Sequence, residues 1–474
     1  MRKLALLVIY NANLVDKNIS QKGYIVCDEG KIISVNKNDG EKPVDPAITG
    51  AERKSATSDT ADSAAPSKSD ITYYDAQGLT LMPAFIDMHA HFRYPGQPQK
   101  EDLDSGLAAA KNGGFGTLVL MPNTNPVISS YEQAMSVINQ ARAKKMSNIF
   151  QTASITKNFE GRDTSHILNL NQNEIPVITE DGHDVLSSDI MLDGMKKAAS
   201  KNIIVSCHCE DPDLAVRARE YRQKALALMK EYKIPAWGVI PSDVKVPQNI
   251  LDEISKNLSE ANELLRTAED TFTERNIQLA HDAGCKIHIC HVSTKGALES
   301  VQLAKQKGWN CTCEVTPHHI ALTGEKIPEI LALVNPPLRT QTDHDCVIAA
   351  LRDGTIDTIS TDHAPHTADD KAAGAPGFTG SETAFAVCNT VLVKQEGFSL
   401  MRLSELMSAN AAEILGLKKG LLNAQYDADF VLVDPDENWI VNAKNFASKG
   451  KASPFEGKTL TGRVKKLFVA GREI

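Results

Sequence analysis

Two histidines separated by one residue follow an apolar run, in the segment Asp87-Met88-His89-Ala90-His91. The run 85–91 has the composition of a buried β-strand, and residues i and i+2 of a strand project from the same face. His89 and His91 would therefore point the same way, and neutral imidazoles so placed are good ligands for Zn²⁺. Taken alone, the pair also fits two unrelated polar residues.

Other residues able to bind metals or transfer protons stand at the ends of further apolar runs. His208 closes the run 203–208, His291 closes 286–291, Asp181 follows 176–180 and Asp362 follows 358–361. His208 alone would be interpreted as a hydrogen-bonded core histidine, but these residues together with the first pair favour one shared metal site. A metal ion there would lower the pKa of a water molecule to about 7. Asp362 could then collect and deliver a proton beside that water.

Arg93 lies two residues beyond the histidine pair. A guanidinium binds a carboxylate with two parallel hydrogen bonds, which a lysine cannot do. The position therefore predicts an anionic substrate, and the competing interpretation is a surface salt bridge.

These residues need a scaffold that brings strand ends together, and eight strand-like runs alternate with amphipathic segments along the chain. The runs are 85–91, 117–121, 149–154, 176–180, 203–208, 286–291, 310–315 and 358–361. This alternation predicts an α/β fold with a parallel sheet, and the number of runs predicts a closed (β/α)₈ TIM-like barrel. Catalytic groups of such barrels lie at the C-terminal ends of the strands.

Short β-like runs at both ends of the chain predict a small β-sandwich domain built from both termini. We divide the chain into an N-terminal part of this domain (1–82), a metal-dependent hydrolase barrel (83–417) and the C-terminal part of the β domain (418–474). Residues 41–70 are rich in Ser, Ala, Thr, Asp and Lys, which predicts a flexible insertion. Residues 215–268 exceed what a barrel connection needs and predict inserted helices.

The composition narrows the choice of partners and compartment. The net charge is -9 without a basic stripe, which argues against nucleic acid and anionic membranes. The apolar run 4–10 is short for a secretory signal, and no stretch approaches a membrane span. Nine cysteines, an odd number, fit reduced thiols in the cytoplasm. The pairs Cys207/Cys209 and Cys311/Cys313 allow a structural zinc site, but small core residues are the stronger interpretation.

The order of the motifs resembles that of the dihydroorotases, which belong to the amidohydrolase superfamily. The resemblance spans nearly the whole chain, apart from the 41–70 and 215–268 segments. It rests on the following motifs: His89-Ala90-His91-Phe92-Arg93-Tyr94-Pro95-Gly96, Met121-Pro122-Asn123-Thr124-Asn125-Pro126, Thr316-Pro317-His318-His319, Asn335-Pro336-Pro337-Leu338-Arg339, Thr361-Asp362-His363-Ala364-Pro365-His366, Gly377-Phe378-Thr379-Gly380-Ser381-Glu382-Thr383, Asp427-Ala428-Asp429 and Ser453-Pro454-Phe455-Glu456-Gly457.

The resemblance implies a role for each matching residue. His89 and His91 would bind one Zn²⁺, His208 and His291 a second, and Asp181 would bridge the two. The run 175–180 contains no lysine, as in the bacterial branch that bridges with aspartate, although Glu180 stands where many members have another aspartate. Asp362 would bind the first ion and act as the acid and base. The substrate-binding residues would be Arg93, Asn123 and His366 for the carboxylate, and Asn335, Gly377 and Phe378 for the ring.

The implied activity is reversible hydrolysis of (S)-dihydroorotate to N-carbamoyl-L-aspartate by a zinc-bound hydroxide, in de novo pyrimidine biosynthesis. We expect a homo-oligomer, with possible association with aspartate transcarbamoylase. Two alternatives stay open. One is another cyclic amidase, such as a dihydropyrimidinase, hydantoinase or allantoinase. The other is a non-catalytic subunit that keeps the fold and serves assembly.

Overall fold

The computed structural model describes residues 6–43 and 71–474 of the chain. The flexible insertion predicted for 41–70 lies outside the described residues from 44 onward. Among the described residues, no helix is long and apolar enough to cross a membrane.

Eight strands of the described chain follow one another in a parallel arrangement, as the alternating pattern predicts. They are β6 (Phe85–Ala90), β7 (Phe115–Leu120), β8 (Asn148–Gln151), β9 (Val177–Thr179), β10 (Ile204–Cys207), β11 (Ile287–Ile289), β12 (Cys311–Val315) and β13 (Thr358–Ile359). All residues of β6 and β7 are buried, because helices cover one face of a parallel sheet and the barrel interior covers the other. The predicted α/β architecture is confirmed.

The ladder of backbone hydrogen bonds is interrupted at two seams, so the expected continuous closure is absent. β6 to β8 and β9 to β13 form separate sheets, joined by single bridges between Ala153 and Ile178 and between Ala90 and His363. At the second seam a side chain replaces a backbone partner, because Thr361 N donates to Asp87 Oδ1 at 2.9 Å. The sequence pattern predicts the strands, but it does not predict that a side chain takes the place of a backbone acceptor at this seam.

Helices connect the strands and enclose the main core. They are α1 (Leu103–Gly113), α2 (Tyr131–Lys144), α3 (Ser188–Ser200), α4 (Pro212–Glu231), α5 (Gln248–Ala283), α6 (Lys295–Gln306), α7 (Pro317–Ala321), α8 (Gln341–Asp353), α9 (Ala368–Ala372), α10 (Ala384–Cys388), α11 (Leu400–Ser404) and α12 (Asn410–Leu415). Local signals set their ends: Asp102 accepts from Ser105 N at the start of α1, and Gly114 ends it at φ 83°.

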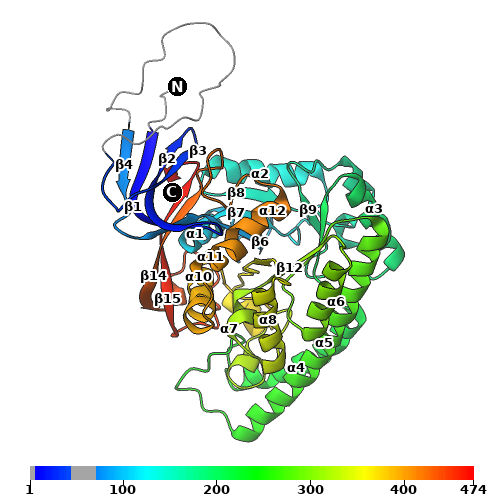
Figure 1. Ribbon diagram of the computed structural model, residues 1–474. Helices are drawn as coiled ribbons and strands as arrows, with labels where there is room; N and C mark the ends of the chain where they lie inside the picture. The colour runs from blue at the N-terminus through cyan, green and yellow to red at the C-terminus, as the bar shows by residue number, and fades with distance from the viewer. Residues whose placement is uncertain (1–5, 44–70) are drawn as a thin grey trace.

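Strands from both ends of the chain lie in one sheet, where Figure 1 shows the blue and red segments side by side. The sheet contains β1 (Leu6–Val15), β2 (Ser20–Asp28), β3 (Lys31–Lys37), β4 (Ile71–Asp75), β5 (Thr80–Pro83), β14 (Phe430–Ile440), β15 (Thr459–Val469) and β16 (Arg472–Glu473). β14 pairs with β5, which pairs in turn with β1. The predicted association of the two ends is present, while the exact domain boundaries stay a prediction.

The predicted insertion at 215–268 falls on a helical hairpin. α4 and α5 run side by side and project from the lower part of the molecule in Figure 1. A cluster of apolar side chains, including Met229 and Leu258, joins the hairpin to Leu331 beside the barrel. α5 continues without a break to Ala283, so the insertion and the barrel helix before β11 are one element.

Candidate metal centre

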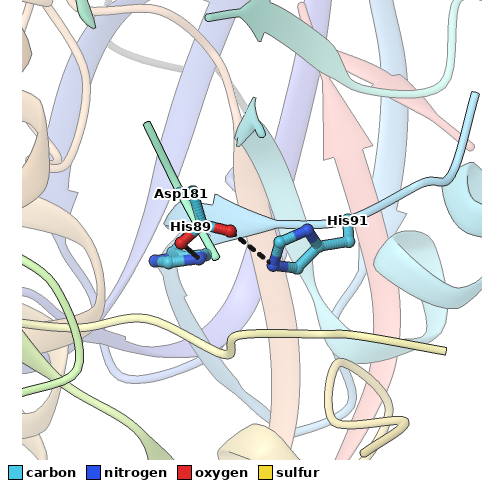
Figure 2. A group of neighbouring side chains, drawn as sticks. All are labelled: His89, His91 and Asp181. Carbon is cyan, nitrogen blue, oxygen red and sulfur yellow. Dashed lines mark ion pairs between the residues drawn. The ribbon is translucent and has the colours of Figure 1, made fainter. Parts of the chain in front are cut away.

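His89 on β6, His91 directly after β6 and Asp181 after β9 lie close together at the C-terminal ends of the parallel strands. Figure 2 shows Asp181 between the two imidazoles, with ion pairs to both. The Nε2 atom of His89 lies 3.2 Å from Asp181 Oδ1, and that of His91 lies 3.5 Å from Oδ2. All three residues are buried, and their donor atoms are close enough to share one ion.

The other predicted ligands surround the same point. Asp362 Oδ1 lies 3.1 Å from His91 Nε2, and His208 Nδ1 lies 2.9 Å from His291 Nε2. Asp181, His208 and His291 form a second group whose donor atoms could hold an ion. The structure therefore brings together all six residues predicted as ligands.

The backbone of two of these residues is in the left-handed region that non-glycine residues rarely adopt. φ is 33° at His291 and 45° at Asp362, and both residues leave the end of a strand. Such conformations persist where the surroundings hold them and gather at functional sites.

Hydrogen bonds to the Nδ1 atoms of His89 and His91 leave the Nε2 atom of each imidazole facing the cluster. Glu314 Oε1 lies 3.0 Å from His89 Nδ1, and Asn123 Oδ1 lies 3.0 Å from His91 Nδ1, so both Nδ1 atoms must donate. The Nε2 lone pairs then face the carboxylates of Asp181 and Asp362. His89 Nε2 and Asp181 Oδ1 also have no hydrogen-bond partner among the described residues. Each Nε2 atom must share a proton or a metal cation with the carboxylate that it faces, and imidazoles grouped with carboxylates are ligands that Zn²⁺ binds, so the donor set fits a metal.

The protonation equilibria lead to the same conclusion. Burial disfavours charge on His208, yet Glu210 and Asp181 raise its pKa to about 9. Burial also favours the neutral form of Asp362, but His91 and His89 hold its pKa well below the usual range. Burial and neighbouring cations lower the pKa of His91, and that of His291 to about 3, so these two imidazoles are neutral and can bind a metal.

A layer of polar residues beneath His89 was not predicted from the sequence. Glu314 on β12 is buried, lies 3.1 Å from His288 Nε2 and accepts a hydrogen bond from Ser360. Burial alone would raise the pKa of Glu314, but His288 and His89 hold it well below the usual range. His89, Cys290 and Glu314 form a third group able to hold an ion. Strand alternation places Glu314 on one face with Thr312, opposite Cys313, which is the signal that could have identified it.

Residues predicted to bind a carboxylate lie beside the cluster. Arg93 Nη2 is 3.1 Å from His366 Nε2, and Arg93 Nε donates to the Pro365 carbonyl at 3.3 Å. Burial and the Arg93 charge lower the pKa of His366 to about 2, so this imidazole is neutral and accepts from Arg93. Asn123 donates to Asp181 Oδ2 at 3.0 Å, so its amide bridges two predicted ligands.

The residues predicted to position the substrate ring form hydrogen bonds with other parts of the chain. Asn335 Oδ1 accepts from Arg222 on α4 at 2.6 Å. The Gly377 carbonyl accepts from the buried Lys371 at 2.9 Å, and the Phe378 carbonyl accepts from Ala364 N at 2.8 Å. Arg222 and Lys371 had no predicted role.

The adjacent histidines of the Thr316-Pro317-His318-His319 motif lie on α7, which follows the end of β12. Both are buried. His319 contacts Thr316 Oγ1 and the Pro336 carbonyl, whereas His318 Nε2 has no described hydrogen-bond partner. Pro317 begins the helix directly after β12, which the strand-like sequence before it conceals.

All nine cysteines are free thiols. Cys207, Cys209, Cys311 and Cys313 belong to the main apolar core, as the interpretation as small core residues expects.

The sequence of this chain is similar to those of known proteins. The model of the Amidohydrolase family matches residues 80–474. A curated dihydroorotase of Clostridium botulinum is 38% identical over 406 residues, covering 85% of this chain and 90% of that protein. A dihydroorotase of a Sulfurihydrogenibium species is 33% identical over 475 residues, covering 98% of this chain and 99% of that protein.

Solved structures show the same fold. An L-hydantoinase (dihydropyrimidinase) from Arthrobacter aurescens has a TM-score of 0.77 at 22% identity, covering 99% of this chain and 95% of that chain. A D-hydantoinase (dihydropyrimidinase) from a Thermus species has a TM-score of 0.73 at 21% identity, covering 98% of this chain and 94% of that chain.

Proposed function

Because the chain belongs to the amidohydrolase family and, within it, to the dihydroorotases, we propose that the cluster around Asp181 is the metal centre at which it hydrolyses a cyclic amide. The reaction is the reversible hydrolysis of (S)-dihydroorotate to N-carbamoyl-L-aspartate, in de novo pyrimidine biosynthesis. The observation that carries the site assignment is the convergence of four imidazoles and two carboxylates on one buried point.

The metal is Zn²⁺, with two ions per subunit. His89, His91 and Asp362 would hold one ion, His208 and His291 would hold the other, and Asp181 lies beside both groups. Neutral imidazoles with carboxylates suit Zn²⁺. When bound, such ions make water a nucleophile at neutral pH and polarise the scissile carbonyl.

Asp362 is the acid and base of the reaction. Hydrolysis breaks the ring carbon–nitrogen bond, and the departing nitrogen must gain a proton that the attacking water loses. Asp362 lies at the cluster, 3.1 Å from His91 and 3.6 Å from His89, where a carboxylate can take that proton and pass it on.

The substrate carboxylate is held by Arg93, His366 and Asn123. The Arg93 guanidinium has no carboxylate within 4.0 Å among the described residues, which leaves its charge available for an anion. Neutral His366 accepts from Arg93 at Nε2, so its proton is on Nδ1, which has no described hydrogen-bond partner. Asn335 and the Gly377–Phe378 segment position the ring.

The hydantoinase and dihydropyrimidinase alternatives share the fold but act on rings without this carboxylate. A buried cation beside the metal cluster favours an anionic ring over a neutral one. A non-catalytic subunit usually lacks some metal ligands, so the grouping of all six predicted ligands argues against this alternative.

The protein is also proposed to work in the cytoplasm as a homo-oligomer, with aspartate transcarbamoylase as a possible associate. Sedimentation of the purified protein with and without that enzyme tests the oligomeric state and the association.

The decisive experiment is turnover of L-dihydroorotate by the zinc-loaded protein, with dihydrouracil, hydantoin and allantoin in parallel. Selective turnover of dihydroorotate is expected. Turnover of a neutral ring instead would keep the metal chemistry and overturn the substrate. Absence of turnover of all four, with metal bound, would favour the assembly subunit.

A further inference from the structure

The inserted helix α4 reaches the predicted substrate site through one side chain. Arg222 donates from Nη1 to Asn335 Oδ1 at 2.6 Å and from Nη2 to the Val334 carbonyl at 3.1 Å. Two donors of one planar group therefore hold both the backbone and the side chain of the segment that contains Asn335.

This contact fixes which end of the Asn335 amide faces Arg222. A guanidinium has donors and no acceptor, so the atom opposite it must be the amide oxygen. No other hydrogen bond of this side chain is present in the described part of the chain. The Nδ2 group is therefore turned away from Arg222 and keeps both of its protons for a ligand.

Both residues line a cavity of about 410 Å³ that also includes Glu210. Glu210 Oε2 lies 3.9 Å from Nε2 of His208, a predicted metal ligand, so the cavity borders the metal cluster. Arg222 has no carboxylate within 4.0 Å among the described residues, and its buried Nε has no described partner. The cavity thus presents a guanidinium without a direct ion pair beside an amide donor, and it also holds the carboxylates of Glu210 and Asp370.

We propose that Arg222 is a positioning and specificity-determining residue for the reaction: it holds Asn335 so that the amide NH₂ faces the substrate, and its charge favours an anionic ring. The inference rests on the proposed function. An acceptor oxygen of dihydroorotate would meet a donor at Asn335. Without Arg222 the amide could rotate and present its oxygen, which would repel the same acceptor.

The test compares Arg222→Met with Arg217→Met, which removes an exposed arginine of the same helix. Loss of one charge-assisted hydrogen bond predicts a rise in KM for dihydroorotate of about tenfold in Arg222→Met. The kcat, the metal content and the melting temperature should stay close to those of the wild type, and Arg217→Met should match the wild type throughout. An unchanged KM in Arg222→Met, or an equal rise in both variants, would overturn the proposal.

A second variant keeps the contact and reverses the group that faces the substrate. Asn335→Asp still accepts from Arg222, so the fold is retained, but an oxygen replaces the NH₂. We expect KM for dihydroorotate to rise at least as much as in Arg222→Met. A wild-type KM in Asn335→Asp would refute the orientation argument.

The wild-type control separates the two claims. If the wild type fails to hydrolyse dihydroorotate, the proposed function fails. If the wild type is active and Arg222→Met has the same KM, only the role of Arg222 fails.

Discussion

Glu314 Oε1 lies 3.0 Å from His89 Nδ1, although 225 positions separate the two residues in the chain. The contact fixes the imidazole tautomer and directs Nε2 toward Asp181. A carboxylate behind a ligating histidine also makes that histidine a stronger base, so Glu314 should support metal binding at His89 Nε2 through its contact with His89 Nδ1.

Glu314→Gln should therefore weaken metal binding by about 10- to 100-fold, which is the usual cost of losing such a partner. Competition with a fluorescent zinc chelator measures the affinity. Glu299→Gln, a change on the exposed face of α6, provides the matched control. Equal chelator concentrations for half-removal in both variants would contradict a supporting role for Glu314.

Asp362→Asn should lower kcat by about 10³-fold, within the range that general acid–base groups contribute. Bound zinc should remain largely intact, because the other five ligands are unchanged. Steady-state kinetics and metal analysis of the same preparation check both. Loss of both ions would assign Asp362 a mainly structural role.

Arg93→Met should mainly raise KM for dihydroorotate, because Arg93 binds a carboxylate that is present in both the ground state and the transition state. The lost charge-assisted contact predicts a change of about tenfold or more. Arg142→Met, at an exposed position on α2, serves as the control. A KM equal to that of the wild type would disprove the assignment.

Asp343 should make the stability of the protein depend on pH in the acid range. Arg266 donates to its two carboxylate oxygens at 2.7 and 2.6 Å. Burial would raise the pKa of Asp343, but these bonds lower it to about 2 from an ordinary 3.8. A lowered folded-state pKa means that the ion pair stabilises the fold above pH 3.8 and that this contribution is lost as the pH falls toward 2.

Asp343→Asn should accordingly lower the free energy of unfolding at pH 7 by about 1–2 kcal/mol, a value reduced to allow for the partial exposure of Arg266. The difference from the wild type should shrink between pH 4 and the lowest pH at which the protein stays folded. Urea unfolding of metal-free protein measures it, because acid also releases metal. Asp345→Asn, at an exposed position of α8, should show no such trend.

Much of the fold could be predicted because the eight parallel strands are short, mostly apolar and separated by helices. The ligands could be predicted for the same reason: strand alternation turns His89 and His91 to one side, and the other ligands stand at strand ends. These are local properties, visible in a few neighbouring residues.

The contacts that could not be predicted join residues that are distant in sequence. Neither the pairing of Arg222 with Asn335 nor that of Glu314 with His89 leaves a local signal. The seam at Thr361 depends on the Asp87 side chain replacing a backbone acceptor, and α7 begins at a proline inside a strand-like context. In each case tertiary packing decides between local alternatives.

The sheet shared by the two ends of the chain has a consequence for synthesis on the ribosome. β5 pairs with β1 early in the chain, but its other edge is covered by β14, which begins at Phe430. That edge stays open until nearly the entire chain has been translated, while the barrel segments between them emerge. An exposed strand edge can pair with other chains, so the interval between synthesis of β5 and of β14 is the period in which a nascent chain is most open to aggregation.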